Sequence, residues 1–120
     1  MRYLTEEQLK SNLKLGMSVE QWINHEKHDG YTVLKWLRID KERNATYSIC
    51  YIECFDDGNE LFTDIYHFDP LDPDEPYIID NFESIDEALA FAINSYAATE
   101  TRFVSAGMIQ EEYKDFLNSK

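Results

Sequence analysis

The chain has 120 residues, with 24 aspartates and glutamates against 11 lysines and arginines, and a formal net charge of −13. This length fits one domain, residues 1–120, and its content of 43% hydrophobic and 14% aromatic residues excludes a disordered acidic tail. The apolar runs are far shorter than the ~20 residues that span a bilayer. The first residues are acidic and polar where a signal peptide has an apolar stretch. We therefore expect a cytoplasmic protein.

The N-terminal third predicts two short helices, each opened by a capping-box pattern. The capping pairs are Thr5 with Gln8 and Ser18 with Gln21. The apolar residues behind them are Leu9 and Leu13 in the first helix and Val19, Trp22 and Ile23 in the second. Gly16 ends the first helix, and Asp29-Gly30 ends the second.

The middle of the chain predicts an antiparallel meander. Residues 31–40 and 45–55 are rich in β-branched and aromatic residues, and 45–55 is apolar on both faces, which is typical of a central strand. The sequence Asp56-Asp57-Gly58-Asn59 indicates a hairpin turn, so residues 60–68 are expected to return as a third strand. A short fourth strand is expected at residues 77–79.

Two more helices are predicted near the C-terminal end. Ser84 and Glu87 form another capping box. The apolar stripe of the helix behind it consists of Ile85, Leu89, Ala92 and Tyr96. The last helix begins near residue 108, with Ile109, Tyr113, Phe116 and Leu117 on one face. The prediction is an α+β fold, in which a three- to four-stranded antiparallel meander packs against helices from both ends of the chain, on one face.

The two cysteines predict neither a disulfide nor a metal site. Cys50 and Cys54 are four residues apart in a predicted strand, which places them ~13 Å apart, about twice the separation that a disulfide bridges. No further ligands lie at a short spacing, and the histidines of His25-Glu26-Lys27-His28 do not have the spacing of a zincin motif. We expect two reduced cysteines packed as small hydrophobes, and no cofactor.

The charge is distributed very unevenly along the chain. Residues 44–101 contain 14 acids and no lysine or arginine, whereas the other 62 residues hold 11 bases and 10 acids. Acids spread for solubility are normally interleaved with bases. Concentrated negative charge speeds the encounter with a cationic partner, and the lack of bases disfavours binding to nucleic acid or to an anionic membrane. A generally acidic protein with a solvated face remains the alternative.

The densest acidic stretch is His67-Phe68-Asp69-Pro70-Leu71-Asp72-Pro73-Asp74-Glu75-Pro76-Tyr77. Its three prolines keep the segment out of a strand ladder and stiffen it, so the carboxylates lose less entropy on binding. We predict a partner-binding surface in which acids steer the encounter and two aromatic side chains act as anchors. The acids are Asp56, Asp57, Glu60, Asp64, Asp69, Asp72, Asp74 and Glu75, and the anchors are Phe68 and Tyr77.

Catalysis is the alternative of a different class. His67 with Asp64 or Asp69 has the residue types of a general acid–base set, which would require a concave pocket around His67. The four glycines are isolated, so they do not form a phosphate-binding loop. We predict no catalytic residues.

The architecture, the acidity and the phrase Asn81-Phe82-Glu83-Ser84-Ile85-Asp86-Glu87-Ala88-Leu89 resemble bacterial toxin-immunity proteins, most of all those of contact-dependent growth inhibition systems. The resemblance implies a non-catalytic protein that binds a cognate toxin domain, often a basic nuclease, and neutralises it. It carries over a role and no residues. The remaining candidate is a DNA mimic that inhibits a host DNA-binding protein, which would space its carboxylates like phosphates along an elongated surface.

Overall fold

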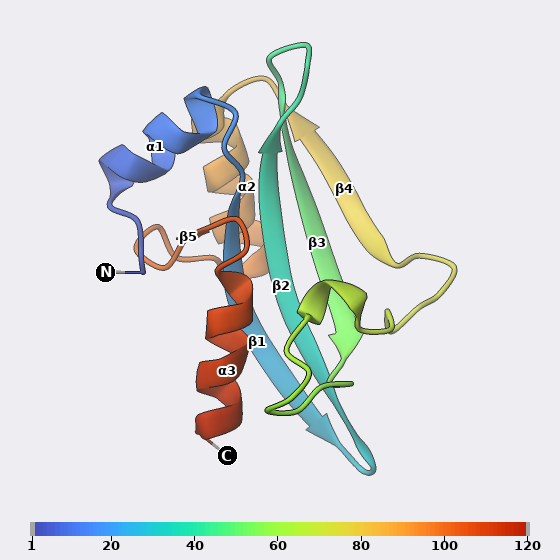
Figure 1. Ribbon diagram of the computed structural model, residues 1–120. Helices are drawn as coiled ribbons and strands as arrows, with labels where there is room; N and C mark the ends of the chain where they lie inside the picture. Colours follow the sequence, from blue (N-terminus) through green and yellow to red (C-terminus); the bar gives the residue numbers. More distant parts are fainter. Residues whose placement is uncertain (1, 120) are drawn as a thin grey trace.

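A twisted five-stranded antiparallel sheet, in the order β4-β3-β2-β1-β5, forms the centre of the computed structural model, which describes residues 2–119 (Figure 1). The elements in chain order are α1 (Glu6–Lys14), β1 (Val19–His28), β2 (Tyr31–Lys41), β3 (Tyr47–Phe55), the 3-10 helix η1 (Ile65–His67), β4 (Tyr77–Phe82), α2 (Ile85–Tyr96), β5 (Val104–Ser105) and α3 (Ile109–Asn118). β1 to β4 form the meander, and β5 pairs with β1. The predicted α+β class is confirmed.

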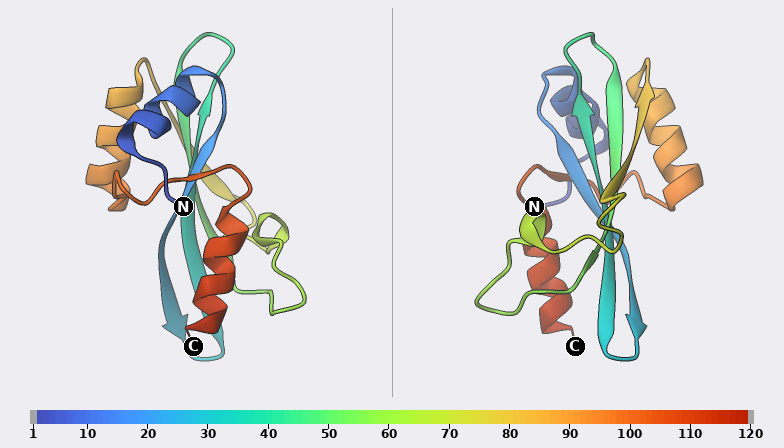
Figure 2. Two further views of the ribbon diagram at one scale, coloured as in Figure 1. Left: turned by 60° about the vertical axis from the view of Figure 1, so that its left-hand side comes forward. Right: turned by 90° about the vertical axis from the view of Figure 1, so that its right-hand side faces the viewer.

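Helices cover both faces of the sheet, whereas the sequence led us to expect one. α2 packs on one face over β3 and β4, and α3 lies on the opposite face beside β1 (Figure 2). The reason lies in β2, where Leu34 and Trp36 point to one face and Leu37 and Ile39 to the other, all four of them buried. Because β2 is apolar on both faces, helices must pack on both faces of the sheet to bury its side chains.

Two clusters of buried side chains result. The first joins Leu9 and Leu13 of α1 to α2 and includes Leu37 and Ile39 of β2. The second lies under α3 and η1 and includes Leu34 and Trp36. The sheet therefore separates a core that contains α1 and α2 from a core that contains α3.

The three helices lie where the sequence predicts them. At the start of α1, the Gln8 amide donates to Thr5 Oγ1 (3.1 Å) and the Thr5 amide donates to Gln8 Oε1 (3.0 Å), which completes the predicted capping box. Ser84 Oγ accepts from the Glu87 amide (3.2 Å) at the start of α2. These short-range signals were sufficient because each cap is satisfied within its own first turn.

The helix predicted behind Ser18 is wrong, because these residues begin strand β1. Ser18 donates to Asp40 of the neighbouring strand and not to its own first turn. The Gln21 side chain donates to the Thr99 carbonyl (2.8 Å) and accepts from the Thr99 amide (2.7 Å). Both residues of the apparent capping box thus form hydrogen bonds with residues far away in the sequence. Because Glu20 and Gln21 are polar but buried, β1 lacks the alternation of apolar and polar residues that would have identified it as a strand.

The strand predicted at residues 60–68 is also wrong. Asn59 and Phe62 exchange two backbone hydrogen bonds of 3.0 Å in a tight turn, and residues 65–67 then form η1. Ile65 and Phe68 are buried at a spacing of three, which fits a 3-10 turn and not a strand. The strand that pairs with β3 is instead β4, which begins at the predicted Tyr77 and extends to Phe82.

The cysteines pack as predicted. Cys54 is buried and Cys50 is half-buried, and both are free thiols. Burial raises the pKa of Cys50 to about 11 and that of Cys54 to about 12. Both are protonated near neutral pH, so neither is an activated nucleophile.

Candidate interaction surface

The predicted partner-binding residues lie in one continuous stretch between β3 and the end of β4, which we call the acidic segment, residues 56–80. It leaves the end of β3, runs beside α3, forms η1 and returns along the sheet edge as β4 (Figure 1). Apart from η1, its backbone is irregular as far as residue 76. Without contacts to the rest of the fold, the segment would be a long, flexible loop.

Hydrogen bonds tie the segment to the fold at several points. The Tyr113 hydroxyl of α3 donates to Asp56. The Asp69 amide donates to Asp57 Oδ2 (2.8 Å), and the Phe55 amide donates to the Asp69 carbonyl (2.9 Å). The Leu71 amide donates to the carbonyl of Glu53 in β3 (3.0 Å). These bonds hold residues 56–57 and 69–71 against β3 and α3.

Phe68 is part of this attachment, and its predicted role as an exposed anchor is wrong. Its side chain is 5% exposed, and its ring centroid lies 5.2 Å from that of Tyr113. Gly58 lies against both rings, because a Cβ at this position would come within 2.4 Å of Phe68 Cζ and 2.8 Å of the Tyr113 hydroxyl. Phe68 thus packs into the core under α3 instead of facing a partner.

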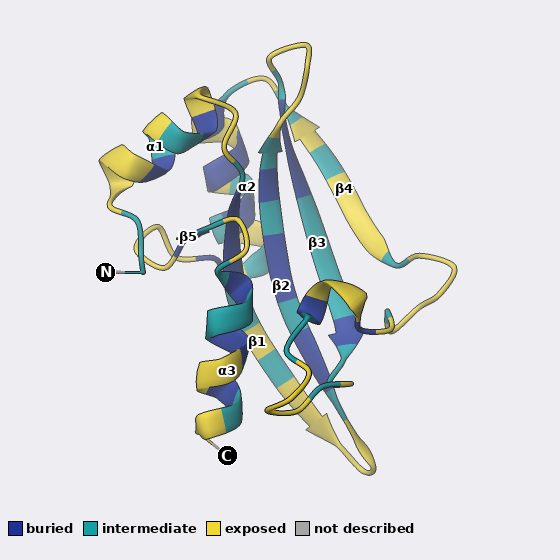
Figure 3. Ribbon diagram, viewed as in Figure 1, coloured by how far each residue is buried: buried dark blue, intermediate teal, exposed yellow. Residues whose placement is uncertain are grey.

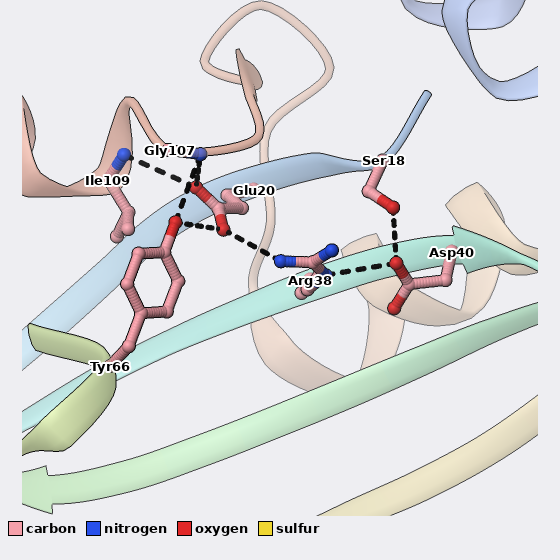
Figure 4. A network of polar contacts seen from close by, with 7 residues as sticks. All are labelled: Ser18, Glu20, Arg38, Asp40, Tyr66, Gly107 and Ile109. Atoms are coloured by element: carbon pink, nitrogen blue, oxygen red, sulfur yellow. Dashed lines mark hydrogen bonds and ion pairs between the residues drawn. The ribbon is translucent and has the colours of Figure 1, made fainter. Parts of the chain in front are cut away.

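A buried carboxylate holds η1 in place. Glu20 of β1 is 0% exposed and accepts from the Tyr66 hydroxyl (2.5 Å), the Gly107 amide (2.9 Å) and the Ile109 amide (3.3 Å), while Arg38 Nη1 lies 3.4 Å away (Figure 4). Burial, together with the Glu20 carboxylate, raises the pKa of Tyr66 far above its ordinary value, so this hydroxyl stays a donor. Glu20 therefore joins β1, η1 and the start of α3.

The same network extends across the sheet. Arg38 Nε donates to Asp40 Oδ1 (2.9 Å), and Asp40 also accepts from Ser18 (Figure 4). Burial alone would lower the pKa of Arg38, but the hydrogen bond to Asp40 and the charges of Asp40 and Glu20 raise it above its ordinary value. The guanidinium is therefore committed to these two carboxylates.

Most acids of the acidic segment have no such partner. Among residues 2–119, no lysine or arginine forms an ion pair with eight carboxylates of the segment, those of Asp57, Glu60, Asp64, Asp69, Asp72, Asp74, Glu75 and Asp80. Elsewhere a larger share of the acids has a basic partner, as Arg2 binds Glu112 (2.7 Å) and Asp115 (2.6 Å), and Lys35 binds Glu26 (2.6 Å). The unpaired negative charge of the fold is thus concentrated on this segment.

The acidic segment also carries most of the exposed apolar surface. Ten large hydrophobic side chains are exposed among residues 2–119, and seven of them lie in it: Leu61, Phe62, Tyr66, Leu71, Tyr77, Ile78 and Ile79. Leu61, at the tip of the tight turn, is 98% exposed, and the start of β4 is exposed over three successive residues (Figure 3). Sequence analysis identified Tyr77 but missed Leu61, Ile78 and Ile79. The run Tyr77-Ile78-Ile79 beside three prolines was the available signal.

The histidines do not assemble an enclosed site. His67 Nε2 lies 3.3 Å from Asp64 Oδ2, but the His67 side chain is 74% exposed and open to water. His25 packs against Phe116, and His28 stacks on Tyr31 (4.9 Å between ring centroids). No group of three or more histidine, cysteine, aspartate or glutamate side chains in residues 2–119 is placed to hold a metal ion.

No family model, curated protein or solved structure matches this chain. Within residues 2–119, no helix has both the length and the apolar character needed to cross a bilayer.

Proposed function

We propose that this protein is a non-catalytic inhibitor that binds a cationic protein through the acidic segment, and that the partner is a nuclease toxin domain against which it gives immunity. The observation that carries the proposal is the coincidence, on residues 56–80, of eight acids that have no lysine or arginine partner among residues 2–119 and seven exposed large apolar side chains. Specific interfaces combine such a charged surround with an apolar centre. The cationic groove of a nuclease, which holds phosphates, is complementary to this surface.

Charge and apolar contact have different roles in this proposal. The unpaired acids attract a basic surface from a distance and raise the association rate, with a strong dependence on salt. The apolar side chains of Leu61, Tyr77 and Ile79 lose water on contact and set the lifetime of the complex. A complex held in this way persists at a salt concentration that removes purely electrostatic binding.

The attachment of the segment to β3 and α3 supports the same proposal. A free loop of this length would lose conformational entropy on binding. Here the bonds of Asp56, Asp57 and Tyr66 hold the backbone before any partner arrives. The molecule measures 41 × 35 × 23 Å, and this compact outline supports an inhibitor shaped for one partner over an elongated DNA mimic.

Affinity capture tests the proposal. The tagged protein is incubated with a lysate of the source organism at low and at high salt, with nuclease added to remove nucleic acid, and the bound proteins are identified by mass spectrometry. We expect one basic protein to be retained at high salt and to lose nuclease activity when bound. A mixture of basic proteins that is removed by salt would contradict the proposal and indicate generic acidity.

The captured partner then allows a test of location. Neutralising Asp72, Asp74 and Glu75 together, to Asn, Asn and Gln, should slow association about tenfold at low salt and flatten its salt dependence. The matched control neutralises Glu7, Asp29 and Glu100, three exposed acids outside the acidic segment, and changes the net charge by the same amount. Equal association rates for the two triple variants would exclude the acidic segment from the interface.

A further inference from the structure

The outer edge of β4 is open. β4 is the last strand of the sheet and pairs only with β3, so every second amide and carbonyl points away from the sheet. Within the described part of the chain, no side chain or loop forms a hydrogen bond with the backbone of that edge. Tyr77, Ile78 and Ile79 are 52%, 49% and 52% exposed, so the side chains beside the open edge are apolar.

A hollow lies beside the start of this edge. It has a volume of about 140 Å³, and its walls include Tyr51, Glu53, Leu71, Asp72, Glu75 and Tyr77. A lining that mixes apolar side chains with carboxylates suits a long basic side chain, whose methylene stem packs on apolar surface while its charged head stays near the acids. Lys35 lies 3.6 Å from Glu53 but binds Glu26 more closely (2.6 Å), so negative charge remains at the rim.

A second copy of this chain does not suit the edge. Pairing two β4 strands would bring together two copies of the same acids, and residues 44–101 supply no base to offset them. The acids in and beside β4 are Asp72, Asp74, Glu75, Asp80 and Glu83. Natural proteins place charge on exposed edges to prevent such self-pairing. The same charge favours an edge strand that carries bases.

We propose that an extended segment of a basic protein adds to the free edge of β4 as a sixth strand, with one lysine or arginine side chain in the hollow beside Tyr77. Main-chain hydrogen bonds to β4 provide the register, and contacts with Tyr77, Ile78 and Ile79 add apolar burial. This inference rests on the proposed function, because it names the part of the acidic segment that the cationic partner contacts and the form in which it binds.

A synthetic peptide serves as the probe. It alternates lysine and valine over about eight residues, is blocked at both ends, and is added at about 1 mM to the isotopically labelled protein. Hydrogen exchange of the β4 amides is followed by NMR. We expect exchange of alternate amides within residues 77–82 to slow about tenfold, because only the outward-facing ones gain partners. The same peptide methylated on every backbone nitrogen keeps its charge but cannot form the ladder, and should give no protection.

Two further outcomes separate this inference from the proposed function. Replacing Asp72 with Asn and Glu75 with Gln should weaken the peptide about tenfold, whereas replacing Glu7 and Glu100 with Gln should not. Binding without protection of β4, equal binding of the methylated peptide, or no binding at about 1 mM would overturn strand addition. A basic protein captured at high salt in any of these cases would leave the proposed function standing, and its absence would remove the proposed function.

Discussion

The acids of this protein fall into two regions that use the same charge differently. In α1, β1, β2 and α3, carboxylates bind bases from distant parts of the chain, as Glu112 and Asp115 bind Arg2 and as Glu20 and Asp40 surround Arg38. In the acidic segment, eight carboxylates lack a lysine or arginine partner among residues 2–119. The paired carboxylates stabilise the fold, whereas the unpaired carboxylates of the acidic segment contribute little to its stability.

The difference separates charges that stabilise the fold from charges that do not. A charge that stabilises a fold is found beside its counter-charge, since an isolated charge gains nothing from being near others of its own sign. We propose that the unpaired acids act instead at the interface described above. Substitutions that remove carboxylates from each region, or that add a Cβ where the acidic segment is tightly packed, test this difference.

The largest effect is expected from Glu20→Ala in the paired region. The substitution leaves Arg38, Tyr66 and the amides of Gly107 and Ile109 without their shared acceptor in a buried site. Removing one partner of such a buried network costs about 3–5 kcal/mol. Denaturant unfolding followed by tryptophan fluorescence measures it, with Glu7→Ala, an exposed acid, as the matched control. A loss below about 1 kcal/mol would mean that the network is not needed for stability.

An intermediate effect is expected from Gly58→Ala, which tests how firmly the acidic segment is held. The added Cβ would meet the Phe62 carbonyl, the Phe68 ring and the Tyr113 hydroxyl, and such overpacking costs about 1–3 kcal/mol. Hydrogen exchange over residues 56–70 should speed up more than exchange in α2. The nearby exposed Glu60→Ala serves as the control and should change neither. Unchanged exchange in the Gly58 variant would show that the loop adapts at no cost.

The smallest effect on stability is expected from the triple neutralisation of Asp72, Asp74 and Glu75. Because these acids lack basic partners, the free energy of unfolding should change by less than about 0.5 kcal/mol or rise slightly as self-repulsion falls. The companion variant neutralises Glu112, Asp115 and Asp40, which are paired, and should be clearly destabilised. Thermal unfolding at low salt compares the two. Equal destabilisation would remove the distinction between the regions.

Sequence reasoning succeeded where the signal was local. The caps at Thr5 and Ser84 are satisfied within one turn, and the apolar stripe of α3 is continuous from Ile109 to Phe116, so these helices were predictable. The charge distribution was also predictable, because the absence of lysine and arginine from residues 44–101 is a property of the sequence itself.

It failed where partners lie far away in the sequence. Ser18 and Gln21 resemble a helix cap, but they bind Asp40 and Thr99, which no short window reveals. The burial of Phe68 depends on Tyr113, 45 residues later, so a surface anchor and a core side chain are identical at the level of sequence. For the surface, the acids could be predicted, but not the open edge of β4, because an edge is defined by the strand order.

The bonds of Glu20 also have a consequence for the order of folding. Glu20 is made early in synthesis, whereas two of its partners, Gly107 and Ile109, lie 87 and 89 residues further on. The cluster that contains α1 and α2 draws on residues up to Phe103, whereas the cluster under η1 needs Tyr113 and Phe116. The α2 side can therefore pack without α3, whereas Glu20 keeps its water until α3 docks. The acidic segment reaches its final shape only when α3 docks, because Asp56 and Phe68 both contact Tyr113.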